Sequence, residues 1–334
     1  MVELNGKKIL VTFLMHLGDL TLTTPFIHAL RKAAPDAHIT MLVDEKLKDV
    51  VLFNPYLDEV VTIDKKGRDN SILSLWACSR HLSKLDFDVL INLHPNERCS
   101  FIDAMTSVKL RTGTTHKIFK WFWDVFTPLD RSMHAADMYL DVLQQLGVQD
   151  LSNNGLEIFP GEEHFLEAEL FWQEQNITDQ DKLIGFNIGS AVPTKRWPPE
   201  RFAEVADIFA AKGYKTVFFG GPMDEEMVAE ATGYMQTRPI IATGHFAIGG
   251  LAAAMRRCCL IITNDSGPMH VAISQKVPIV AMYGPSNPKL YGPYTKDAVI
   301  VTAQPPCQGC ADGMKHSCDD LQCMSRMTVE QVVA

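Results

Sequence analysis

The sequence predicts an α/β protein with two domains, each a parallel sheet covered by helices on both faces. Short and almost purely apolar runs alternate with stretches of helical spacing, and this alternation pauses once and then starts again. Strands that are apolar on both sides are typical of parallel sheets buried between helices. The length of 334 residues also fits two domains of about 100–200 residues each.

The N-terminal half contains the first set of predicted elements. Its apolar runs are Ile9–Leu14, Ile39–Val43, Val60–Ile63 and Val89–Leu93. Apolar residues at helical spacing lie between the first two runs, and a further helix is expected over His134–Gly147, where glycine suits the C-cap. Residues 148–162 are turn-rich and lack sustained periodicity, so we expect the inter-domain linker there. The predicted domains are therefore residues 1–155 and 156–334.

The C-terminal half repeats the same plan. Its predicted strands are Leu183–Ile188, Thr216–Phe219, Ile240–Ala242, Leu260–Thr263 and Ile279–Tyr283. Helices are expected between them, for example over Pro199–Lys212 and Asp224–Met235. Two similar α/β domains that face each other enclose a central cleft, which is a usual place for a large ligand.

Composition excludes several classes of protein. The net charge is −9, from 31 Lys and Arg against 40 Asp and Glu, so the sequence does not favour a nucleic-acid partner. An acidic balance still allows a local basic patch that binds one anionic ligand. The sequence has neither an apolar stretch of about 18 residues nor a recognisable targeting segment, so we expect a soluble, cytoplasmic protein.

Asp19 is the first candidate for a catalytic residue. It follows the first predicted strand in the segment His16-Leu17-Gly18-Asp19. In open α/β sheets, ligands bind outside the carboxyl ends of the strands, where a carboxylate can act as a general base for a hydroxyl. The alternative is that Asp19 only caps the next helix, and spacing does not decide between the two.

Two further segments follow predicted strands of the C-terminal half. Ser190 and Lys195 lie after Leu183–Ile188, where small residues, a hydroxyl and a cation can bind a phosphate; the alternative is a solvated basic turn. The segment 263–270 carries Asp265, Ser266, Gly267, Pro268 and His270, and its backbone N–H groups would favour an anion such as a pyrophosphate. A helix cap with a core histidine is the alternative there.

Two segments carry less specific signals. Residues 109–126 interleave basic and aromatic side chains, a pattern typical either of a membrane interface or of an amphipathic element whose aromatics serve the core. The C-terminal cysteines Cys307, Cys310, Cys318 and Cys323 have a spacing that suggests a structural zinc site. Reduced thiols and oxidative pairing are the alternatives for these cysteines.

Taken in order, the motifs resemble those of glycosyltransferase family 9, the lipopolysaccharide heptosyltransferases and their relatives. The matching segments are Gly18-Asp19 with Thr24-Pro25 and Ala29-Leu30-Arg31, Lys195-Arg196-Trp197-Pro198, Gly220-Gly221 with Asp224, and Asp265-Ser266-Gly267-Pro268-Met269-His270 with Tyr283-Gly284-Pro285. The resemblance runs from about residue 8 to residue 290. One departure is Met15-His16-Leu17, which replaces the serine-rich turn of the best-known members.

The resemblance implies a GT-B fold of two Rossmann-like domains facing a central cleft, with the acceptor in residues 1–155 and the nucleotide sugar in residues 156–334. It implies inverting transfer from ADP-heptose to a lipid A-linked oligosaccharide of the lipopolysaccharide inner core, without a required cofactor. It also implies peripheral contact with the inner face of the inner membrane. Asp19 matches the general base, and the matching donor-binding residues are Gly18, Ser190, Lys195, Asp224, Asp265, Ser266, Gly267 and His270.

Three other functions stay open at this point. A glycosyltransferase of the same family with another nucleotide-sugar donor fits the same motifs. A sugar-nucleotide epimerase shares the two-domain layout but needs its own acid and base, and a non-catalytic nucleotide-binding module needs neither. A Rossmann dehydrogenase is disfavoured, because the sequence contains no G-x-G-x-x-G fingerprint.

Overall fold

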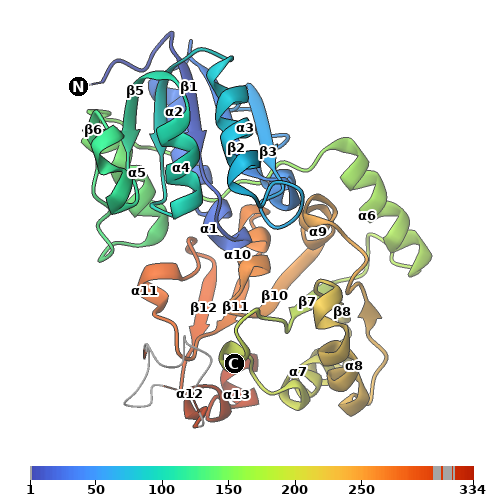
Figure 1. Cartoon of the computed structure of the whole chain (residues 1–334). Helices are drawn as coiled ribbons and strands as arrows, with labels where there is room; N and C mark the ends of the chain where they lie inside the picture. The colour runs from blue at the N-terminus through green and yellow to red at the C-terminus, as the bar shows by residue number, and fades with distance from the viewer. Residues whose placement is uncertain (1, 304–309, 311–317, 319) are drawn as a thin grey trace. The chain divides into compact units, whose positions relative to one another are not determined.

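The computed structural model describes residues 2–303, 310, 318 and 320–334. The chain divides into two compact units, Met1–Phe159 and Pro160–Ala334, which we call unit 1 and unit 2 (Figure 1). The division falls just after the predicted boundary at residue 155. Leu156 and Ile158 are buried, and Glu157 Oε2 lies 2.9 Å from His28 Nδ1, so these residues belong with unit 1.

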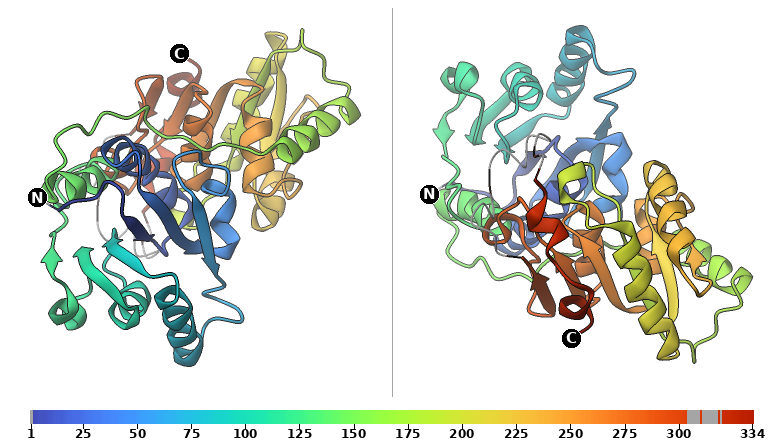
Figure 2. Two further views of the ribbon diagram at one scale, coloured as in Figure 1. Left: turned by 90° about the horizontal axis from the view of Figure 1, so that it is seen from above. Right: turned by 90° about the horizontal axis from the view of Figure 1, so that it is seen from below.

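Unit 1 is built on a six-stranded parallel sheet in the order β3-β2-β1-β4-β5-β6. The strands are β1 Lys8–Thr12, β2 His38–Asp44, β3 Glu59–Ile63, β4 Phe87–Asn92, β5 Val108–Gly113 and β6 Val125–Phe126. The helices are α1 Leu17–Thr21, α2 Thr24–Ala33, α3 Ile72–Ser83, α4 Glu97–Met105 and α5 Ala135–Gln145, with 3-10 turns η1 Glu45–Val50 and η2 Lys117–Phe122. Figure 2 shows α2 and α5 on one face of this sheet and α3 and α4 on the other.

Unit 2 contains a second six-stranded parallel sheet, in the order β12-β11-β10-β7-β8-β9. The strands are β7 Leu183–Asn187, β8 Lys215–Phe219, β9 Ile240–Ile241, β10 Cys258–Asn264, β11 Ile279–Met282 and β12 Ala298–Val301. The helices are α6 Glu162–Glu174, α7 Pro199–Ala211, α8 Glu225–Tyr234, α9 Ile248–Met255, α10 Gly267–Ser274, α11 Pro288–Tyr291, α12 Gln322–Ser325 and α13 Val329–Val333, with 3-10 turns η3 Pro193–Lys195 and η4 Pro222–Asp224.

The predicted α/β architecture with two parallel sheets is confirmed. The central strands are apolar because helices cover both of their faces, and Ile9, Leu10 and Val11 of β1 are fully buried. The predicted first strand ran too far, since β1 ends at Thr12. We did not expect the outer strands β5, β6 and β12, whose burial is mixed.

Both sheets have the same topology, and it determines where ligands are expected. Counted along the chain within each unit, both orders read 3-2-1-4-5-6, the doubly wound arrangement of mononucleotide-binding folds. The strand order reverses between β1 and β4 in unit 1 and between β7 and β10 in unit 2. Ligands of such sheets bind outside the carboxyl ends of the strands at these two switch points. Among the residues that the structure describes, no helix is both long and apolar enough to cross a membrane.

A buried carboxyl group connects the two central strands of unit 1 to α4. Asp103 Oδ2 accepts hydrogen bonds from Thr12 Oγ1 at 3.0 Å and from Asn92 Nδ2 at 2.5 Å. Burial raises the pKa of Asp103 to about 8, so this carboxyl group is protonated at neutral pH. Its Oδ1 has no hydrogen-bond partner among the described residues and is the oxygen on which the proton would lie.

We expect Asp103 to make unfolding depend on pH. In the folded chain Asp103 keeps its proton up to a pH of about 8. In the unfolded chain an aspartate has a pKa of about 3.9 and has lost its proton above that pH. The free energy of unfolding should therefore fall as the pH rises between these two values, and Asp103→Asn should remove that part of the slope. Thermal unfolding of both proteins between about pH 6.5 and about pH 8 measures it, and the comparison cancels the contribution of histidines, which titrate near about pH 6.5 in both proteins. Equal slopes for the two proteins would contradict the prediction.

Candidate functional site

Asp19 lies in the loop-helix segment that follows β1. It is the third residue of α1, whose N-cap is His16, so the alternative that Asp19 caps this helix is wrong. The side chain is partly exposed at the carboxyl edge of the sheet. Gly18 precedes it in the same helical turn. A partly exposed carboxylate at the β1/β4 switch point is positioned to meet a ligand of unit 1.

Two side chains from the loops after β3 and β4 contact the segment that leads to Asp19. Lys65, just after β3, donates from Nζ to the carbonyl oxygens of Leu14 at 3.0 Å and Met15 at 2.8 Å. The same ammonium lies 3.1 Å from Asp44 Oδ2, and both side chains are largely buried. Asn96 Nδ2 approaches Met15 Sδ at 3.8 Å from the loop after β4. The β1–α1 loop is thereby fixed from both sides.

His94 lies at the end of β4, beside this loop. Its ring meets Phe13 edge-on, with ring centroids 6.0 Å apart. Burial, together with the nearby charges of Arg131 and His16, lowers the pKa of His94 to about 4. The imidazole is therefore neutral at neutral pH, and its Nδ1 has no hydrogen-bond partner among the described residues.

In unit 2, two buried asparagines connect the ends of β7 and β10. Asn187 Nδ2 donates to Thr263 Oγ1 at 2.9 Å and to Ser266 Oγ at 2.8 Å. Asn264 Nδ2 donates to the carbonyl oxygen of Ile188 at 2.7 Å, and its Oδ1 accepts from the backbone N–H of Trp197 at 3.0 Å. These bonds fix the loops after both strands at the switch point of the second sheet.

A buried ion pair lies at the same switch point. Lys195 Nζ lies 2.7 Å from Asp265 Oδ2, with the two side chains 13% and 6% exposed. Ser286, in the loop after β11, donates its hydroxyl to the same carboxylate oxygen. Burial, with Asp265 beside it, raises the pKa of Tyr283 well above its usual value, so this hydroxyl stays neutral. The ammonium of Lys195 is thereby held by a carboxylate at this switch point.

Asp224 reaches the end of β7 because two glycines leave room for it. A Cβ atom on Gly189 would lie 2.2 Å from Asp224 Oδ1, and one on Gly220 would lie 2.9 Å from Asp224 Cβ. The backbone N–H of Gly221 donates to Asp224 Oδ2 at 2.9 Å. The carboxylate therefore packs next to Gly189, whose neighbour Ser190 is buried.

The segment after β10 forms the start of α10. Ser266 is the N-cap and Gly267 the first helical residue, with a proline in the first turn. His270 lies one turn further along and is buried at 4% exposure. The N-terminal end of a helix carries partial positive charge, so this turn and the ammonium of Lys195 together can bind an anion such as a diphosphate.

The structure thus brings together most of the residues predicted for donor binding. Ser190, Lys195, Asp224, Asp265, Ser266, Gly267 and His270 all lie on the strand-end loops of unit 2 or on α10. Gly18 and Asp19 lie in unit 1 instead. Sequence reasoning missed Lys65, His94, Asn187 and Ser286. Of these, Asn187 and His94 had a signal, because Asn187 lies near the end of one apolar run and His94 directly follows another.

The cysteine cluster falls partly outside the described residues, since Cys307 is not among them. Cys323 is buried at the start of α12, whereas Cys310 and Cys318 are half-buried. Within the part of the chain that the structure describes, no three side chains of His, Cys, Asp or Glu gather as metal ligands. The zinc prediction therefore finds no support in the described cysteines.

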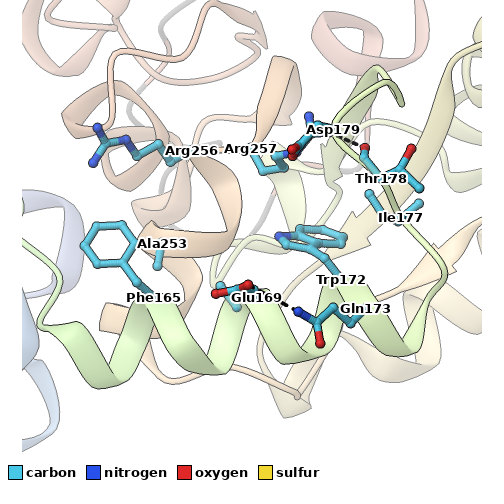
Figure 3. Close-up of a pocket in the computed structure, with 11 residues that line it drawn as sticks. Phe165, Glu169, Trp172, Gln173, Ile177, Thr178, Asp179, Ala253, Arg256 and Arg257 are labelled. Atoms are coloured by element: carbon cyan, nitrogen blue, oxygen red, sulfur yellow. Dashed lines mark hydrogen bonds between the residues drawn. The ribbon is translucent and has the colours of Figure 1, made fainter.

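A separate cavity of about 760 Å³ lies in unit 2 between α6 and the end of α9 (Figure 3). Trp172 and Phe165 line it together with the charged residues Glu169, Asp179, Arg256 and Arg257. Arg257 Nη2 donates to the carbonyl oxygen of Thr178 at 2.6 Å. Residues 177–179 and 256–257 precede β7 and β10, so the cavity lies at the amino edge of the sheet, opposite the loops that carry the candidate donor-binding residues.

Two Rossmann-like units, each built on a parallel six-stranded sheet, have the architecture of GT-B glycosyltransferases. A family model described as glycosyltransferase family 9 (heptosyltransferase) matches residues 75–318. The chain therefore belongs to glycosyltransferase family 9, and it is a glycosyltransferase. The predicted family and enzyme class are confirmed.

Known relatives agree with this assignment. A crystal structure of a family 9 glycosyl transferase from Veillonella parvula DSM 2008 is 54% identical, with a TM-score of 0.95 over 99% of this chain and 96% of that chain. Lipopolysaccharide heptosyltransferase 3 of Escherichia coli (strain K12) is 24% identical over 297 residues, 84% of each chain. The structure of E. coli ADP-heptose LPS heptosyltransferase II is 21% identical, with a TM-score of 0.80 over 98% of this chain and 96% of that one, and supports the fold.

Proposed function

We propose that this glycosyltransferase moves heptose from ADP-heptose to the lipid A-linked inner core of lipopolysaccharide, with inversion at the anomeric carbon. The names of the relatives support the donor and the acceptor. In this proposal unit 1 binds the acceptor and unit 2 binds the nucleotide sugar. The enzyme works on the cytoplasmic face of the inner membrane, where a lipid-linked acceptor is available.

The buried Lys195–Asp265 pair at the β7/β10 switch point is the observation that carries the proposal. A donor diphosphate would take Lys195 as its cation and the first turn of α10 as a source of N–H donors. Ser190 and His270 would add hydrogen bonds, and Asp265 with Asp224 would accept bonds from sugar hydroxyls. These groups stabilise the charge that develops on the departing ADP, so the proposal requires no metal ion.

Asp19 is proposed as the general base. Its carboxylate removes the proton from the acceptor hydroxyl while that oxygen attacks the anomeric carbon of the donor. The new C–O bond forms on the face opposite the bond to the diphosphate, which breaks and releases ADP as an anion. One carboxylate suffices for this single displacement, because the leaving group needs charge stabilisation and no covalent intermediate forms.

The experiment that tests the function measures ADP release from a panel of nucleotide sugars, with and without a truncated lipid A-linked acceptor. The proposal expects acceptor-dependent ADP release with ADP-heptose above all other donors. Preference for another nucleotide sugar would keep the enzyme class and change the donor. Isomerised sugar nucleotide without ADP release would indicate an epimerase, and binding without turnover would indicate a nucleotide-binding module.

A further inference from the structure

An exposed apolar surface of unit 1 plays no part in the candidate site. Every residue of η2 is at least partly exposed, and the exposed fractions of Ile118, Trp121 and Phe122 are 59%, 95% and 45%. Two exposed lysines, Lys117 and Lys120, belong to the same turn. We call these five residues the η2 surface. An almost fully exposed tryptophan costs free energy in water unless another phase or molecule covers it.

The turn is held in place by its other aromatic residues, so its exposed side chains are not loosely placed. Phe119 packs edge-on against Phe101 of α4, with ring centroids 6.2 Å apart. Trp123 is buried and donates from Nε1 to the carbonyl oxygen of Thr112 at 3.0 Å. Trp123 therefore serves the core, as one of the two sequence-based alternatives expects, whereas Trp121 faces solvent.

A second exposed apolar patch lies on the same helical layer. Figure 2 shows α3, α4 and η2 side by side on one face of the unit 1 sheet, and α4 contacts both of its neighbours. Ile72, Leu73 and Trp76 at the start of α3 are 67%, 75% and 52% exposed. Two patches on one layer favour an extended partner over a small ligand.

The local charge indicates what kind of partner covers this surface. The η2 turn contains Lys117 and Lys120 and no aspartate or glutamate, although the whole chain has a net charge of −9. Lys109 is paired with Asp88 at 2.7 Å and Arg111 donates to backbone carbonyl oxygens, so the charge of this surface comes from its own two lysines. Lys120 Nζ lies 4.3 Å from the ring centroid of Phe126, so a cation and aromatic faces share one site. Lysines beside exposed aromatics are typical of segments that lie in an anionic membrane interface.

A second copy of the chain fits this surface poorly. A symmetric dimer through η2 would bring two sets of like charges together, which opposes association. We propose that the η2 surface, together with Ile72, Leu73 and Trp76 of α3 on the same helical layer, docks unit 1 on a bilayer that contains anionic phospholipid. The choice of a membrane as the partner rests on the proposed function, in which the acceptor is linked to a membrane lipid. The vesicle-binding test itself needs neither donor nor acceptor.

Sedimentation of the full chain with vesicles tests the proposal. Binding is expected to vesicles of phosphatidylglycerol and phosphatidylcholine, to weaken with added salt, and to be much weaker with phosphatidylcholine alone. Trp121→Ser should lower the affinity about tenfold or more, because it removes the largest exposed apolar side chain of the turn. Lys117→Gln and Lys120→Gln should each lower it about fivefold at low salt.

The matched control lies on α6, where Leu166 and Leu170 are 58% and 51% exposed. This helix contains glutamates and neither lysine nor arginine, so Leu166→Ser and Leu170→Ser should leave vesicle binding unchanged. Equal binding to both vesicle types, or unchanged binding by the Trp121 variant, would overturn the proposal. Concentration-dependent self-association that Trp121→Ser abolishes would instead make the surface an interface between two copies. Transfer to a detergent-dispersed acceptor should stay normal in the lysine variants, which separates this test from that of the enzymatic function.

Discussion

Asp19→Asn is expected to lower the rate of sugar transfer by roughly 10²–10⁴, the usual contribution of a general base. The amide has nearly the same size as the carboxylate but cannot take the proton from the acceptor hydroxyl. Asp19 is the third residue of α1, so the substitution leaves the N-cap residue His16 unchanged. Turnover with saturating ADP-heptose and acceptor measures the effect.

The same variant should bind ADP as tightly as the wild type, because all proposed donor-binding side chains lie in unit 2; the one donor-binding residue predicted in unit 1, Gly18, has no side chain and is unchanged. Isothermal titration calorimetry measures this affinity. Asp86→Asn is the matched control: this exposed residue has a φ of 55°, which asparagine adopts readily, and it precedes β4 at the opposite edge of the same sheet. Near-normal turnover of the Asp19 variant would exclude Asp19 as the base.

The layout of the sheets could be predicted from sequence because burial on two faces leaves a clear pattern. The central strands β1, β4, β7 and β10 are near-continuous apolar runs, and both units repeat the pattern. The strands β5, β6 and β12 gave no such signal. In β5, Lys109 and Arg111 alternate with apolar residues, and in β12 two apolar side chains remain exposed. Their pairing depends on neighbouring strands that are distant in sequence.

The candidate site was predictable where a residue directly follows a buried strand. Asp19, Asp265 and Ser266 follow β1 and β10 closely, and strand ends of parallel sheets collect ligands. The supporting residues were not predictable, since their roles come from tertiary contacts. Lys65 lies in a polar stretch, and its two bonds to the β1–α1 loop span about fifty residues of sequence. Ser286 likewise meets Asp265 only because β10 and β11 are neighbours.

Lys195→Ala should weaken the binding of ADP roughly 10- to 100-fold, which corresponds to the loss of about 1.5–3 kcal/mol from a hydrogen bond to a charged group. The ammonium of Lys195 pairs with Asp265 in this structure. In the proposed complex it would contact the donor diphosphate, either alone or together with Asp265. Removing it leaves the carboxylate of Asp265 buried without its cation, which repels an anionic ligand. Both effects act in the same direction, and titration calorimetry with ADP measures their sum.

The stability of the Lys195 variant has to be measured beside its affinity, because breaking a buried ion pair destabilises a fold. The double variant Lys195→Ala with Asp265→Asn removes the orphaned charge. It should regain thermal stability and remain weak in ADP binding, since the cation is still missing. Lys212→Ala, at the exposed C-terminal end of α7, is the control for loss of a lysine elsewhere in unit 2. If the double variant bound ADP as tightly as the wild type, the contact between Lys195 and the diphosphate would be excluded, and repulsion by Asp265 alone would explain the weak binding of the single variant.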